Sequence, residues 1–255
     1  MDGRLFADEL LYCEGKHKPW FRGKIHLASL VLAPAALNYI QSTGSGNSPW
    51  IYMNLFGNIM CFAMSGLYHT FEWSSKTEII LQKLDHQAIS VWTVTMMTPI
   101  AFHIFPTEIR VQFMTISIAT FLANSYATWS SRPSTILASS IPASVLLFLG
   151  ECWKHMSSEE LTFMYWGFVF QSVGTVMYTL SNRGYKLYGK DTVYGYHELF
   201  HTFTVAAAYC VYMCNHTIVR EPRFPYDPSF KGNPWFPLDP SFECDRVIKI
   251  SENNV

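Results

Sequence analysis

Long stretches of mostly apolar residues recur along the chain, separated by short polar connections. About 20 apolar residues are needed for one α-helix to cross a bilayer. Seven stretches approach this length, and each is predicted to form a transmembrane helix: 25–41, 50–72, 85–105, 109–128, 134–150, 161–181 and 196–218. The pattern therefore predicts an all-α fold, a seven-transmembrane helix bundle, in which 134–150 is a short and rather polar span.

The distribution of basic residues predicts the orientation of this bundle. If the N-terminus is cytoplasmic, the inner segments contain most of the Lys and Arg residues: Arg4, Lys16, Lys18, Arg22, Lys24, Lys76, Lys83, Arg132, Arg183, Lys186 and Lys190. The outer loops then contain Arg110 and Lys154. Because short cytoplasmic segments are enriched in Lys and Arg, we expect a multi-pass integral membrane protein with a cytoplasmic N-terminus and an extracytoplasmic C-terminus.

The two ends of the chain differ in composition from the predicted membrane domain, 25–218. Residues 1–24 are polar and mixed in charge, which predicts a cytoplasmic segment without a cleavable signal peptide. Residues 219–255 are Pro-rich and contain a near repeat, FPYDPSF at 224–230 and FPLDPSF at 236–242. Pro at this density excludes a regular helix. We expect a flexible extracytoplasmic tail, with an ordered cap or a partner-binding peptide as the alternative.

Composition and charge agree with a membrane protein. Charged residues make up 15% of the 255 residues, aromatic residues make up 16%, and the net charge is −1. An average soluble domain has about 25% charged residues. The near-neutral charge also argues against a nucleic-acid partner. The 6 cysteines contain no C-x-x-C pair and do not suggest a disulfide framework.

The stretch YGYHELFHTF, 194–203, contains the first candidate chemistry. His197, Glu198 and His201 match the zinc-protease signature H-E-x-x-H, but the apolar run that follows is typical of a membrane helix. The two histidines are separated by about 400° of rotation and about 6 Å of rise on a helix, so both lie on one face. A metal ion can bridge such a pair, whether in a protease or in a different zinc site within a membrane.

Further polar groups are predicted at the same membrane depth. His69 ends one span on the cytoplasmic side, Asp85 begins the next span on that side, and Ser65 lies one turn before His69. His197 and His201 lie at the cytoplasmic start of the predicted span 196–218. Five polar side chains from three helices are therefore expected to converge at one level. Intramembrane polar groups are costly and are candidates for a functional site.

The remaining histidines are weaker candidates. His103 and His216 lie some 15–18 residues from the cytoplasmic ends of their helices, which corresponds to about 23–27 Å. His155 falls in an outer loop and His17 in the N-terminal segment. His86 is an alternative ligand next to Asp85, but it points about 100° away from it. His26 begins a span on the cytoplasmic side and could support the site, although nothing local favours this role.

Three histidines with an open fourth position are typical of a catalytic zinc site. We therefore predict Zn²⁺ as the cofactor, with His69, His197 and His201 as its ligands. Asp85 is the predicted general base, since zinc lowers the pKa of a bound water to about 7 and the carboxylate could hold that water. Ser65 would orient the water or His69.

The motifs RGKIHL, SGLYHTF, KLDHQAI and YGYHELFH, in this order, resemble the hemolysin III family, which belongs with the progestin and adiponectin receptors. The larger superfamily includes alkaline ceramidases. The resemblance covers roughly residues 20–218 and implies seven helices with a zinc ion held by His69, His197 and His201. In that family the last motif is H-x-x-x-H, so Glu198 is not required, and it is predicted to face the cytoplasmic rim.

Three functions remain open at this stage. The first is a zinc-dependent hydrolase of a lipid amide, such as a ceramide, with a membrane lipid as its substrate and partner. The second is a receptor or signalling scaffold in which zinc is structural. The third is a pore-forming protein, which the absence of a row of charged residues along any span disfavours. An open position on the metal favours the hydrolase, whereas a fourth protein ligand such as His86 favours the structural role.

Overall fold

The computed structural model describes residues 18–130, 145–187 and 193–220, and this part of the chain is helical with no strand. All of it belongs to one compact unit, 1–223. The predicted all-α class is therefore confirmed for the described residues. The FPxDPSF repeat at 224–242 lies outside them.

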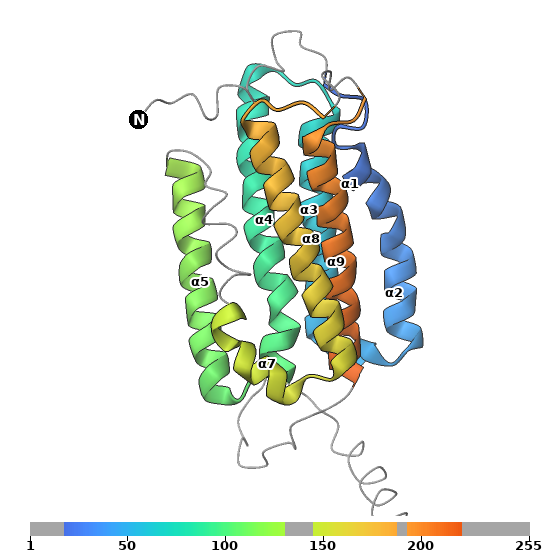
Figure 1. Cartoon of the computed structure of the whole chain (residues 1–255), viewed down its shortest axis with the longest axis vertical. Helices are drawn as coiled ribbons and strands as arrows, with labels where there is room; N and C mark the ends of the chain where they lie inside the picture. The colour runs from blue at the N-terminus through green and yellow to red at the C-terminus, as the bar shows by residue number, and fades with distance from the viewer. Residues whose placement is uncertain (1–17, 131–144, 188–192, 221–255) are drawn as a thin grey trace, which may run out of the picture. The chain divides into compact units, whose positions relative to one another are not determined.

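The helices follow the predicted stretches closely (Figure 1). They are α1 (Lys24–Ser29), α2 (Ala33–Ser42), α3 (Pro49–Thr70), α4 (Ser75–His103), α5 (Thr107–Ser130), α7 (Leu149–His155), α8 (Ser158–Asn182) and α9 (Tyr196–Arg220), with 3₁₀ turns at Leu30–Leu32, Ser45–Asn47 and Val145–Phe148. The predicted span 134–150 falls mostly on residues that are not described. None of the described helices combines the length and the apolar character needed to cross a membrane.

The predicted first span, 25–41, is divided into two helices rather than one. The 3₁₀ turn Leu30–Leu32 separates α1 from α2, and Pro34 stands in the first turn of α2. Proline lacks the N–H that an uninterrupted α-helix would need at this position, so the hydrogen-bond pattern tightens just before it. The two helices remain consecutive along the same side of the bundle (Figure 1).

Helix α4 begins earlier than the predicted span. The expected span starts at Asp85, whereas α4 starts at Ser75, because the side chain of Ser74 accepts a hydrogen bond from the backbone N–H of Thr77 at 3.4 Å. Such an N-cap satisfies one of the free donors of the first turn. Asp85 therefore lies in the third turn of α4, where the helix positions it more firmly than a helix end would.

Two pairs of antiparallel helices, α3 with α4 and α8 with α9, form the most extensive packing, and α4 also contacts α9. Glycine permits these close approaches. A Cβ atom added at Gly57 on α3 would overlap Thr95 on α4, and one added at Gly167 on α8 would lie 2.9 Å from Val211 on α9. Small residues at helix crossings let backbones approach in this way. The end of α3 and the start of α9 consequently meet at one end of the bundle (Figure 1).

Candidate metal centre

Three buried histidines meet where the end of α3 approaches the start of α9. His69 belongs to the last turn of α3, whereas His197 and His201 occupy the first two turns of α9. One ring nitrogen from each lies within 4.8 Å of the others. Their ring centroids are 4.7 Å apart for His69 and His197, 5.0 Å for His69 and His201, and 4.7 Å for His197 and His201. Three histidines chosen by depth along their helices are thus brought together.

The donor set of this centre fits a metal ion. His197 Nε2 and His201 Nδ1 are buried without a hydrogen-bond partner among the described residues. Unpaired buried polar atoms cost free energy and are rare in native proteins. A metal ion bound to these nitrogens would remove that cost, and a set of three neutral imidazoles suits Zn²⁺ among the common metals.

Asp85 lies beside the three histidines. Its Oδ2 atom is 3.6 Å from His69 Nε2, and its Oδ1 atom has no hydrogen-bond partner within the described part of the chain. Ser65 is buried on α3, one helical turn before His69. The predicted roles of Asp85 as base and Ser65 as an orienting hydroxyl stay predictions, although both residues lie near the level of the histidines.

His26 is a fourth histidine at this centre, although no local sequence pattern indicated this role. Its ring stacks on that of His201, with centroids 4.1 Å apart and an interplanar angle of 3°, and its other neighbour is Phe62 at 4.9 Å. The lone pairs of an imidazole lie in the ring plane, so two parallel rings cannot both point at one ion between them. His26 therefore holds the His201 ring in place. The only sequence feature pointing to His26 was its position at the start of the first span, at the same depth as His69.

Three further histidines of the described residues make contacts elsewhere. The Nδ1 atom of His86 lies 2.9 Å from a main-chain carbonyl one turn earlier in α4, and His86 is not part of the group of three. At the far ends of α4 and α9, His103 Nε2 lies 2.9 Å from Ser48 Oγ, and His216 Nε2 lies 2.7 Å from Thr43 Oγ1. These positions agree with the prediction, made from helix depth, that His103 and His216 are not part of the metal site.

Glu198 is not at a rim, and its predicted position was wrong. The side chain is fully buried and forms an ion pair with Arg22. Its second oxygen accepts a hydrogen bond from the backbone N–H of Gly195 at 2.7 Å. Both oxygens are therefore engaged in holding the start of α9, which leaves neither available as the base that the H-E-x-x-H signature of a metalloprotease requires.

A sequence model of the family described as "Haemolysin-III related" matches residues 14–212 of this chain. The chain belongs to the hemolysin III family. The match includes all three histidines together with Asp85, Ser65 and Glu198, and it confirms the resemblance inferred from the four motifs. In this hemolysin III protein the histidine centre therefore lies within the matched range, whereas the tail after Arg220 lies outside it.

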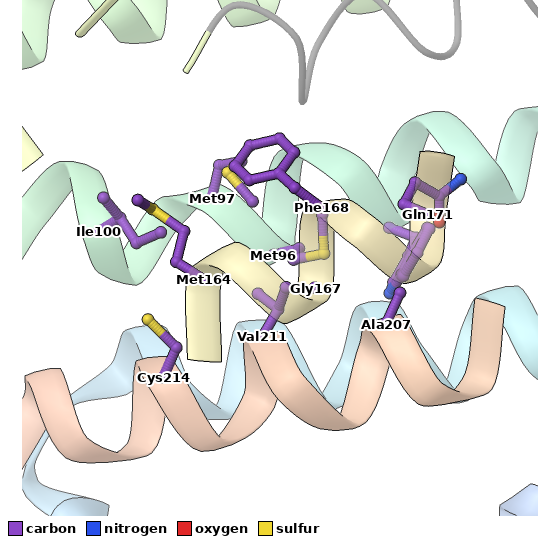
Figure 2. A pocket seen from close by; sticks show the side chains of 11 residues that line it. Met96, Met97, Ile100, Met164, Gly167, Phe168, Gln171, Ala207, Val211 and Cys214 are labelled. Carbon is purple, nitrogen blue, oxygen red and sulfur yellow. The ribbon is translucent and has the colours of Figure 1, made fainter. Parts of the chain in front are cut away.

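A small apolar cavity of about 20 Å³ lies between α4, α8 and α9 of the hemolysin III chain (Figure 2). Its walls include Trp92, Met96, Met164, Phe168, Ala207 and Val211. Ala207 follows His201 by six residues, which corresponds to about 9 Å along α9. The cavity thus begins less than two turns beyond the histidines, and it can accept only an apolar group.

Proposed function

We propose that this chain is a multi-pass membrane protein that hydrolyses a lipid amide by means of a zinc ion held by His69, His197 and His201. The observation that carries the proposal is the buried group of three imidazoles, whose ligand nitrogens lie within 4.8 Å of one another. Asp85 lies next to this group. Because three histidines already supply the ligands, its carboxylate is available for a different role. Three protein ligands and an open position are typical of catalytic zinc.

The membrane location is supported by the family and by the distribution of side chains on α5. Leu122 and Tyr126 are exposed on this helix, whereas Ser117, Asn124 and Thr128 are buried. A helix of a water-soluble protein buries its apolar side chains and exposes its polar ones. The reverse arrangement suits a helix that faces lipid and packs against its neighbours through polar groups.

A zinc ion bound at this centre would polarise the amide carbonyl and make an attacking water more acidic. Asp85 would take the proton from that water through Oδ1 and pass it to the nitrogen of the departing amine, as general bases do. His26 would keep the His201 ring in its orientation by stacking. The oxygen of that water would form a bond to the carbonyl carbon, the C–N bond would break, and the products would be a fatty acid and an amine.

A ceramide-like lipid is the substrate class that we favour. The centre lies at one end of the bundle, and the nearby cavity is almost wholly apolar. A lipid amide has its reactive carbonyl between a polar head and an apolar chain, so it can present both groups at such a boundary. Alkaline ceramidases, which the larger superfamily contains, act on this kind of bond.

The alternatives are weaker on specific grounds. A receptor or scaffold with structural zinc needs a closed site, but the described residues provide a group of three that does not include His86. A pore needs a polar channel, but Trp92, Met96 and Ile100 fill the space between the central helices with apolar atoms.

Hydrolysis itself is the direct test. Purified protein in lipid nanodiscs is incubated with a ceramide, and the released fatty acid is measured by mass spectrometry. We expect release that stops when a chelator removes the metal and returns when zinc is added. If folded, zinc-loaded protein releases no fatty acid from any lipid amide offered, the hydrolase proposal is wrong.

The orientation is tested by two reporter tags. One is inserted in the connection 71–74, between α3 and α4, and the other follows the repeat at 236–242. The positive-inside rule predicts the first tag in the cytoplasm and the second outside. Accessibility to a membrane-impermeant label measures this in intact cells. Both tags on one side would show that the span count is wrong by one, most simply at 134–150.

A further inference from the structure

The segment Lys18–Gly23 precedes α1 and is here called the N-terminal strap. Its first residue, Lys18, donates hydrogen bonds from Nζ to the main-chain oxygens of Tyr68 at 3.1 Å and Phe71 at 2.7 Å. These carbonyls belong to the C-terminal end of α3, where a cation is favourable because the free carbonyls carry partial negative charge. The strap is thus bound to the helix end that contains His69.

The strap is also bound to the segment that leads into α9. The backbone N–H of Phe21 donates a hydrogen bond to the carbonyl of Val193 at 3.2 Å. Arg22 forms its buried ion pair with Glu198, and the two side chains are 7% and 0% exposed. Glu198 follows His197 directly, so this ion pair fixes the turn of α9 from which two of the three histidines project. A buried charge is costly unless it is paired, so the two side chains are held in the arrangement in which each neutralises the other.

Gly23 brings the strap against the third histidine. Its φ angle is +75°, and a Cβ atom added there would lie 2.5 Å from Thr70 Oγ1 and 2.9 Å from the Cβ of His69. No real Cβ atom fits at these distances, so any larger residue would push the end of α3 away. Thr70 Oγ1 also lies 3.4 Å from the carbonyl oxygen of Arg22, which adds a contact at the same place.

We propose that Arg22, Gly23 and Glu198 are positioning residues of the metal centre. The strap sets the separation between the end of α3 and the start of α9, and therefore the distance from His69 to His197 and His201. This inference rests on the proposed zinc site and adds to it a set of residues that do not touch the metal. Residues that orient metal ligands typically change metal affinity by 10- to 100-fold when they are replaced.

Gly23→Ala is the first test, with Gly44→Ala as its matched control. Gly44 has nearly the same φ angle, +76°, but a Cβ atom added there would have no described atom within 4 Å. Both variants place alanine at a positive φ angle, but only the Gly23→Ala side chain would contact His69. We expect Gly23→Ala to weaken zinc binding by about 10- to 100-fold and Gly44→Ala to leave it unchanged, as measured by competition with a chromogenic chelator.

The visible spectrum of the cobalt-loaded protein supplies a second readout. Its band positions depend on the geometry of the ligands, so at saturating cobalt they report how the site is arranged rather than how stable the fold is. A shift in Gly23→Ala but not in Gly44→Ala supports positioning. Identical spectra and affinities for the two variants would overturn the inference. A wild-type protein that binds no zinc would overturn the proposed site as well, which separates the two failures.

Arg22→Gln and Glu198→Gln test the role of the ion pair. A positioning role and a direct charge effect predict different directions of change in zinc affinity for these two variants. If the pair acts on the metal through its charges, loss of Arg22 leaves a carboxylate near the dication and tightens binding, whereas loss of Glu198 leaves a cation and weakens it. If the pair holds α9, both variants weaken zinc binding. We expect the same direction for both, by about 10- to 100-fold.

The control for this pair is Glu151→Gln. It removes a surface ion pair with Lys154, whose Nζ lies 2.7 Å from Glu151 Oε1, and a contact with His155, both on α7 and separate from the three histidines of the metal centre. It should therefore leave zinc affinity unchanged. Gel filtration and thermal unfolding verify that each variant is folded. Opposite signs for Arg22→Gln and Glu198→Gln, or affinities equal to that of Glu151→Gln, would contradict positioning. If one of the pair does not fold, the comparison of Gly23→Ala with Gly44→Ala decides alone.

Discussion

Asp85→Asn is expected to lower lipid amide hydrolysis by a factor of about 10² to 10⁴, the usual contribution of a general base. Asp85 lies 3.6 Å from the ring of His69 and has a second oxygen with no partner among the described residues. Asparagine keeps the size of the side chain and part of its hydrogen bonding, but it cannot take a proton from water. The zinc content should therefore stay at the wild-type level.

The measurement is the initial rate of fatty acid release, with zinc content determined on the same samples. Glu198→Gln is the informative comparison. Any activity that it loses through weaker metal binding should return at saturating zinc, whereas the loss in Asp85→Asn should not. A Glu198→Gln variant that stays inactive when fully loaded with zinc would instead favour the metalloprotease mechanism, in which Glu198 is the base.

If zinc is only structural, Asp85→Asn has a different result. It then changes the stability of the fold by about 1–3 kcal/mol, the cost of disturbing a buried hydrogen-bonding group, and the wild type has no turnover to lose. Thermal unfolding of the zinc-loaded protein distinguishes this outcome from a catalytic role, since the hydrolase proposal predicts a large loss of rate at nearly unchanged stability.

His201→Ala is expected to remove most of the bound zinc, a larger effect than the 10- to 100-fold typical of residues that only orient ligands. The wild type should contain about one zinc per chain, held at roughly 2.0–2.1 Å per nitrogen. Alanine removes one of the three ligands, and no other histidine of the described residues belongs to the group. Elemental analysis of purified protein measures the effect.

His216→Ala is the matched control in the same helix. His216 is also buried, and it also uses a ring nitrogen, which lies 2.7 Å from Thr43 Oγ1, but it is 15 residues beyond His201. This variant should lose the free energy of one hydrogen bond, about 1 kcal/mol, and keep its zinc. Equal zinc loss in both variants would mean that helix depth had selected the wrong histidines.

The helical periodicity of the sequence was enough to predict much of this centre. A spacing of four residues places His197 and His201 on one face, and the depth of each span identifies His69 as their partner. The beginning of α4 was harder to predict, because the first turns of that helix are polar and only the cap at Ser74 marks them. Apolar content identifies the buried part of a helix, whereas capping residues decide where it begins.

Contacts between distant parts of the chain could not be predicted. Glu198 pairs with Arg22 across 176 residues, and neither position is distinguished by a periodic pattern. The stacking of His26 on His201 likewise depends on how α1 lies against α9. Such features follow from tertiary packing, so the sequence could suggest a charged residue at a rim but not its burial against a partner.

The histidines come from the second predicted span and the last one, and this has a consequence for biosynthesis. His69 is translated early, whereas His197 and His201 belong to the final helix of the described chain. A metal ion that joins them closes a very long loop, and such closures constrain the unfolded chain strongly. A nascent chain thus cannot complete the proposed site until α9 has left the ribosome and reached α3. Metal uptake would then follow the synthesis of α9, and chains truncated before α9 would lack two of the three histidines.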